Sequence, residues 1–163
     1  MPGAIDIQNV FESLEWAGMG GDPVAFAPHL SASPLSGNPP RPVLFQVARG
    51  DQTVPNPASA ALVRAARAQS SASLYRHDLA RAAVRDLPAN PHSYLTFFLG
   101  ASPGGLTLPG PVGLSVSLLA QQQLAGFLDS GGATIPDPGA LLRALLGVSL
   151  FEIGTPLPED MGF

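Results

Sequence analysis

The sequence contains no cysteine and no lysine, and it has few charged residues of either sign. Charged residues make up 12% of the chain, about half of the usual share. The absence of cysteine excludes disulfides, thiolate metal sites and a cysteine nucleophile. The eight basic residues, all arginine, are outnumbered by twelve acidic ones, which gives a net charge of −4. That charge argues against a surface that follows a phosphate backbone, and we expect no nucleic-acid partner.

A secretion signal and a long apolar run are also missing. Residues 1–6 contain no basic residue and do not begin an apolar signal-peptide segment, so we expect no signal peptide in this chain. The most apolar stretch, residues 106–128, is interrupted by prolines and by the glutamines at 121–123. It is too polar to cross a bilayer, and we expect no stable membrane span.

Glycine and proline are abundant, with 18 residues each, while apolar residues account for 45% of the chain. Disorder requires low hydrophobicity and high charge, so this composition indicates a globular chain with many loops. A length of 163 residues predicts a single domain spanning residues 1–163.

A strand–helix–strand unit is predicted in the middle of the chain. Residues 42–48 form a nearly continuous apolar run, typical of a strand buried on both faces. Asn56, followed by proline, is the expected cap of a helix over residues 58–69. Residues 73–79 are the second expected strand. Two strands joined by such a crossover should lie parallel in one sheet.

Helices are predicted toward both ends of the chain. Residues 6–17 and 114–128 have apolar residues at helical spacing. Asp137 is expected to cap a shorter helix that ends near Leu146. The proline-rich segment 22–41 is expected to be irregular.

Asp51 and His92 are the strongest candidates for chemistry. Asp51 follows the first predicted strand, and ligands of open parallel sheets bind outside the carboxyl ends of strands. A carboxylate there can accept the Nδ1–H of a histidine from a later loop, which fixes the tautomer and supports an imidazolium. His92 lies 41 residues after Asp51, in such a loop. The alternative is that Asp51 is a turn residue and His92 a polar loop residue.

Short motifs over most of the chain match one family. Residues 42–56, which include Gly-Asp-Gln-Thr-Val-Pro, are similar to the late strand and acid turn of α/β-hydrolases. Residues 74–78 and 90–92 are similar to the strand and histidine loop that follow. Residues 21–28 and 130–138 match further segments of this type. The chain thus resembles the α/β-hydrolases, and among them bacterial lipases and esterases that are secreted or surface-anchored.

The resemblance implies a carboxylic-ester hydrolase that acts on esters or lipids through a Ser-His-Asp triad, without a cofactor or a metal. Asp51 would be the triad acid and His92 the general base. In this fold the serine precedes the acid, within Gly-x-Ser-x-Gly.

The chain departs from the family pattern at the nucleophile. The serines before Asp51 lack that context, and the oxyanion loop is absent; these serines are Ser13, Ser31, Ser33 and Ser36. Ser102 lies in a Gly-x-Ser-x-Gly motif, but it follows His92, and Pro103 lacks the N–H that an oxyanion hole uses. Ser102 is therefore the remaining candidate nucleophile within the chain.

The predicted strands are too few for a complete α/β-hydrolase. We therefore expect the C-terminal portion of the parallel sheet, a βαβ unit with C-terminal helices, which is incomplete on its own and lacks the nucleophile-bearing half. Open strand edges favour association. A homo-oligomer or a partner chain that completes the sheet is thus expected.

Two other interpretations are consistent with the sequence. The first is a metal-dependent phosphohydrolase, since imidazoles and carboxylates bind divalent metals. Its ligands would be His77, Asp78 and His29, with Asp129 or Asp137. The second is a non-catalytic remnant or assembly module that pairs with another chain, for which Leu114, Leu118 and Phe127 would form the interface. His77 is also a second choice for the triad base.

Overall fold

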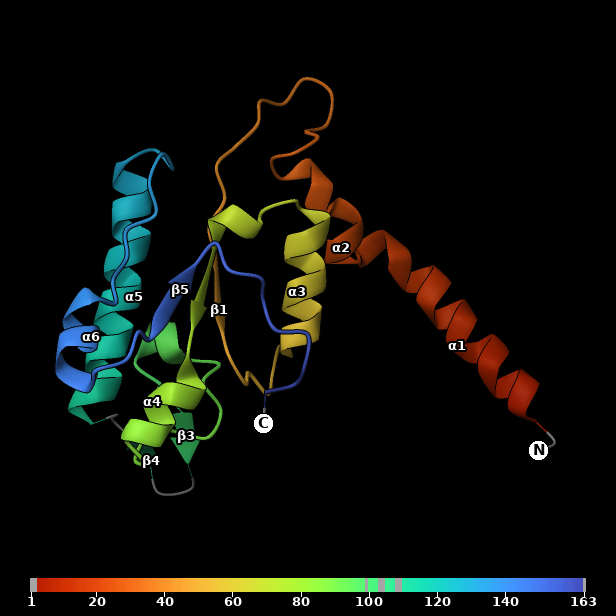
Figure 1. The fold of residues 1–163 in the computed structure, drawn as a ribbon. Helices are drawn as coiled ribbons and strands as arrows, with labels where there is room; N and C mark the ends of the chain where they lie inside the picture. The colour runs from red at the N-terminus through yellow and green to blue at the C-terminus, as the bar shows by residue number, and fades with distance from the viewer. Residues whose placement is uncertain (1–2, 99, 103–104, 108–109, 163) are drawn as a thin grey trace.

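The computed structural model describes residues 3–98, 100–102, 105–107 and 110–162, with the side chains of 100–102, 105–107, 141 and 145 excepted. The fold is mixed α/β, with helices packed on a small open sheet (Figure 1). The sheet has three strands in the order β1-β2-β5. Their bounds are β1 Phe45–Ala48, β2 Ala72–Tyr75 and β5 Phe151–Ile153.

The predicted crossover is present. Helix α3 (Asn56–Ala65) connects β1 to β2, which lie parallel with Val47 opposite Leu74. The helix ends earlier than predicted, because Arg67 has a left-handed φ of 53° and the N–H of Ala68 bonds back to Val63.

The expected parallel arrangement is found for this pair alone among the described strands of the sheet, which as a whole is mixed. Strand β5, which was not predicted, joins the other edge of β2 antiparallel, with Phe151 opposite Tyr75. The predicted strand 73–79 was also too long, because helix α4 (His77–Ala83) begins directly after β2. An acidic residue in the first turn, Asp78, favours that helix start.

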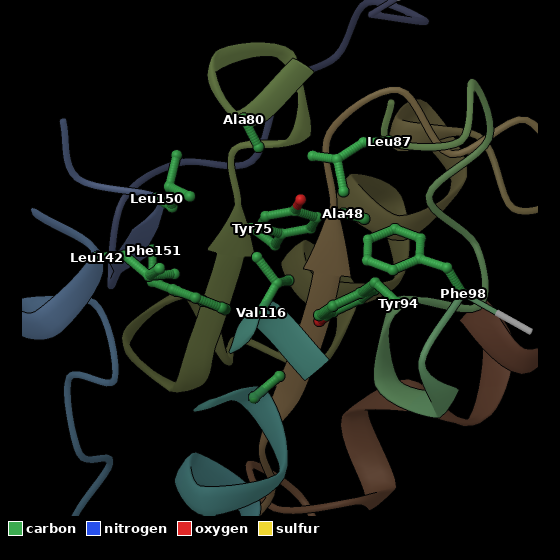
Figure 2. Packing of buried hydrophobic residues seen from close by; sticks show 11 residues of the cluster. Ala48, Tyr75, Ala80, Leu87, Tyr94, Phe98, Val116, Leu142, Leu150 and Phe151 are labelled. Atoms are coloured by element: carbon green, nitrogen blue, oxygen red, sulfur yellow. The ribbon is translucent and has the colours of Figure 1, made fainter. Parts of the chain in front are cut away.

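Helices cover both faces of the sheet. On one face, Val47 and Leu74 pack against α3. On the other face, Ala48 and Tyr75 pack against α5 (Pro111–Asp129). Figure 2 shows Tyr75 at the centre of this second cluster. The rings of Tyr75 and Tyr94 are stacked, with a centroid distance of 5.0 Å. Strands β1 and β2 are thus packed on both faces, and the turn after β1 leaves from this core.

The remaining elements surround the sheet, and two of them add Leu142 and Tyr94 to the second cluster. Figure 1 labels α1 (Ala4–Gly18), α2 (Pro23–Phe26), α6 (Ala140–Leu146), β3 (Gly100–Ser102) and β4 (Gly105–Thr107). Short 3-10 turns are η1 Met19–Gly21, η2 Ala27–His29, η3 Gln69–Ser71 and η4 Tyr94–Thr96. The three predicted helices toward the chain ends are confirmed as α1, α5 and α6.

Helices α1 and α2 show features that the sequence did not predict. Helix α1 has no buried residue and projects from the body (Figure 1). The segment 22–41 is not irregular throughout, because Asp22 caps α2 by accepting a hydrogen bond from the N–H of Val24.

Within the described part of the chain, no helix has both the length and the hydropathy that crossing a bilayer requires.

Candidate functional site

The turn after β1 holds the Asp51 carboxylate in a fixed orientation. Its Oδ1 accepts hydrogen bonds from the backbone N–H groups of Thr53 and Val54, at 2.8 Å and 2.9 Å. An aspartate that bonds to the backbone two and three residues later is typical of a tight turn. The side chain is only 12% exposed, so its other oxygen, Oδ2, is presented from a rigid position.

The side chain of Asn56 holds the start of the same turn through two hydrogen bonds to the backbone. We expected it to cap α3, but it is the first residue of the helix, and its buried amide points back toward β1. Its Oδ1 accepts from the N–H of Gly50 and its Nδ2 donates to the carbonyl of Ala48, both at 2.8 Å. Gly50 has a φ of 78°, and a Cβ there would lie 2.9 Å from the carbonyl oxygen of Gly162, so the position requires glycine.

Asn90 connects this turn to the loop that carries His92. Its Oδ1 accepts from the backbone N–H of Gln52 and from that of His92, each at 3.1 Å. Its Nδ2 donates to Thr53 Oγ1 at 3.1 Å. The loop is also fixed by Pro91, which is buried. The sequence analysis assigned no role to Asn90. Its position directly before Pro91 and the candidate base His92 was the feature that could have indicated one.

His92 and Asp51 are in direct contact, 2.9 Å apart between Nδ1 and Oδ2. An ionised carboxylate only accepts hydrogen bonds, so Nδ1 carries the imidazole proton and Nε2 keeps its lone pair. The His92 side chain is 47% exposed, and no hydrogen-bond partner of Nε2 is found among the described residues. The arrangement can therefore accept a proton at Nε2 while the carboxylate supports the imidazolium.

His77, the second choice for the base, lies in a very different environment. It is 3% exposed and begins α4, whereas we expected it on a strand. Its Nε2–H donates to the carbonyl of Pro88 at 2.8 Å, and Nδ1 accepts from the Tyr75 hydroxyl at 3.2 Å. Burial lowers the pKa of His77, and the nearby Arg81 lowers it further. With both ring nitrogens bonded, His77 cannot serve as the base for Asp51.

Asp78, the neighbour of His77, belongs to a network of ion pairs. Arg76 contacts Asp78 at 2.7 Å and Glu152 at 2.6 Å. Arg49 lies 3.7 Å from Asp78 and 3.0 Å from Asp160. Burial alone would raise the pKa of Asp78, but the hydrogen bonds and charge of Arg76 outweigh it, and the pKa is lowered. Asp78 is thus a structural partner of arginines.

The residues of the metal interpretation are not brought together. Among the described residues, no group of three or more histidine, aspartate or glutamate side chains is placed to hold a metal ion. His29 Nδ1 lies 2.7 Å from the carbonyl oxygen of Ser33, and Asp137 pairs with Arg143 at 2.9 Å. His77 has no free nitrogen, as shown above.

Ser102, the candidate nucleophile, is the last residue of β3 and pairs with Gly105. Its side chain and the following Pro103 and Gly104 lie outside the described residues. The nucleophile prediction therefore stays a prediction.

No family model, curated protein or solved structure matches the chain. The geometry of the Asp51–His92 pair is thus the main evidence for a function.

Proposed function

We propose that Asp51 and His92 are the acid and the base of a Ser-His-Asp triad in a carboxylic-ester hydrolase of the α/β-hydrolase type. One observation carries the proposal: the contact of 2.9 Å between His92 Nδ1 and Asp51 Oδ2. Its location supports the same conclusion, because Asp51 follows the carboxyl end of a strand in a parallel βαβ unit. An ester or a lipid would be the substrate.

In the proposed reaction, Nε2 of His92 takes the Oγ proton of a serine as that oxygen attacks the ester carbonyl. The imidazolium, supported by Asp51, then gives the proton to the departing alcohol, which leaves an acyl-serine. Water attacks the acyl-serine while Nε2 removes its proton, and that proton returns to the serine oxygen as the acid is released.

The serine would be Ser102 or a residue of another chain that completes the sheet. Strand β1 lies at one edge of the three-stranded sheet, so a further strand has a place to pair beside it. A second copy of the chain or a partner chain would supply this strand.

The test treats the purified chain with a fluorophosphonate probe and with a short-chain p-nitrophenyl ester. We expect one phosphonylated serine, identified by mass spectrometry, and loss of both the adduct and the turnover in His92→Ala. Ser102→Ala then decides whether Ser102 is the nucleophile, with Ser149→Ala as the control. Turnover that persists in both Asp51→Ala and His92→Ala would contradict the proposal.

A non-catalytic assembly module is the second candidate, and helix α1 is the observation that favours it. The helix buries none of its residues, although apolar side chains line one face; these are Ile7, Val10, Phe11 and Leu14. A chain that gives neither an adduct nor turnover, alone or at high concentration, would support this candidate.

A further inference from the structure

We infer that Asn90 is the positioning residue that holds His92 against Asp51. This inference rests on the proposed function, since it assigns a role to the hydrogen bond within the proposed triad. Asn90 does not touch the reacting Nε2 and acts only through the placement of the imidazole.

Asn90 joins both segments of the pair through a single side chain. Its Oδ1 accepts one N–H from the acid turn, at Gln52, and one from the histidine residue itself, each at 3.1 Å. Its Nδ2 donates to Thr53, whose backbone N–H bonds to Asp51. The loop of His92 and the turn of Asp51 are thus connected independently of the contact between the two side chains.

The contact needs such a connection because His92 is half-exposed. An ion pair or hydrogen bond at an exposed site contributes little by itself, since water competes and the side chain must lose its freedom. The structure fixes the loop backbone on both sides of the histidine. On one side the His92 N–H is held by Asn90, and on the other the N–H of Tyr94 bonds to the carbonyl of Pro91 at 2.9 Å.

The chemistry of the side chain predicts which substitutions are tolerated. Asn90→Ala removes all three hydrogen bonds. Asn90→Asp keeps both acceptor contacts, and the Thr53 hydroxyl can turn to donate to the new carboxylate. A side chain that acts by position should therefore be rescued by aspartate.

The test measures the Nδ1–H proton of His92 by NMR in the full chain labelled with ¹⁵N-histidine, and His92→Gln assigns its resonance. We expect the exchange of this proton with water to become about tenfold faster in Asn90→Ala, the effect of losing about one hydrogen bond. Asn90→Asp should restore slow exchange. Asn38→Ala is the matched control, because Asn38 is another loop asparagine that bonds to local backbone carbonyls.

Unchanged exchange in a folded Asn90→Ala chain would overturn the inference. If that variant does not fold, Thr53→Val takes its place, because it removes the acceptor of the Asn90 amide, and unchanged exchange there would likewise overturn it. The exchange measurement needs no substrate, so it tests the positioning role of Asn90 separately from the proposed hydrolase function. Faster exchange in Asn90→Ala without any ester turnover in the native chain would leave the positioning role intact while the proposed function fails. Where turnover exists, kcat should fall about tenfold in Asn90→Ala with little change in KM.

Discussion

His92 and His77 lie in neighbouring parts of the fold, yet they have opposite environments. His92 is 47% exposed and bonds to Asp51 through Nδ1. His77 is 3% exposed, and both of its nitrogens are bonded, to the Tyr75 hydroxyl and to the carbonyl of Pro88. Within the described part of the chain, Nε2 of His92 has no partner and its lone pair can act on a reactant, whereas His77 uses both nitrogens within the protein.

The difference shows that an adjacent acid does not make a histidine a base. His77 precedes Asp78 in the sequence, but that carboxylate bonds to Arg76 instead of to the imidazole. Asp51 lies far from His92 in the sequence, and the crossover between β1 and β2 with the following loop brings the two together. The hydrogen-bond partners of each ring decide its chemistry.

The largest effect on ester turnover is expected from Asp51→Asn, which removes the carboxylate that accepts the Nδ1–H of His92. The asparagine can still accept from Thr53 and Val54, but its amide would face Nδ1 and favour the tautomer with the proton on Nε2. Ester turnover should fall by about 10³ to 10⁴-fold, as expected when a triad histidine is held in the wrong tautomer. Steady-state rates with a p-nitrophenyl ester measure this loss.

His77→Gln is the matched control for that substitution. It removes the buried histidine and leaves the Asp51–His92 contact in place, so the folded variant should retain the ester turnover of the native chain. A loss of turnover as large as that of Asp51→Asn would show that the two histidines have been assigned the wrong roles.

The pH dependence of the free energy of unfolding should test whether His77 is buried in its neutral form. The pKa of His77 is lowered in the folded chain, chiefly by burial, from its usual value of 6.5. The unfolded chain therefore binds the proton first, and the free energy of unfolding falls as the pH drops below this value. Urea unfolding between about pH 5 and pH 8 should show a weaker decline in His77→Gln than in the native chain. Equal declines in both proteins would contradict a buried, neutral His77.

The smallest effect is expected from Arg81→Gln. The positive charge of Arg81 lowers the pKa of His77, although burial contributes more. Without that charge the folded-state pKa moves back toward its usual value, and the acid-side loss of stability becomes smaller. Because Arg81 is exposed, the change should stay below about 0.5 kcal/mol. Arg85→Gln, another exposed arginine in the following turn, is the control in the same unfolding measurement.

Local patterns predicted much of the fold and the partners in the site. Helical spacing predicted α1 and α5, and the apolar run before Gly50 predicted β1. The strand-end location of Asp51 and the loop location of His92 led to the expected pairing, which the structure places at 2.9 Å. Their catalytic roles and the nucleophile stay predictions.

Other features could not be predicted from local patterns. Strand β5 is only three residues long, and its antiparallel pairing depends on the edge that β2 offers. The three hydrogen bonds of the Asn90 side chain connect the turn of Asp51 with the loop of His92, which are far apart in the sequence. No local sequence motif predicts them.

The sequence by itself determined where α1, α3, α5 and α6 form and which residue types could carry acid–base chemistry, because periodicity, capping and side-chain chemistry are local properties. Only the tertiary structure decided that α5 packs on the sheet while α1 packs on nothing described. It also decided that both ring nitrogens of His77 are bonded, while Nε2 of His92 has no hydrogen-bond partner among the residues that the structure describes. Burial and hydrogen-bond partners depend on segments far apart in the chain, and the fold alone brings those segments together.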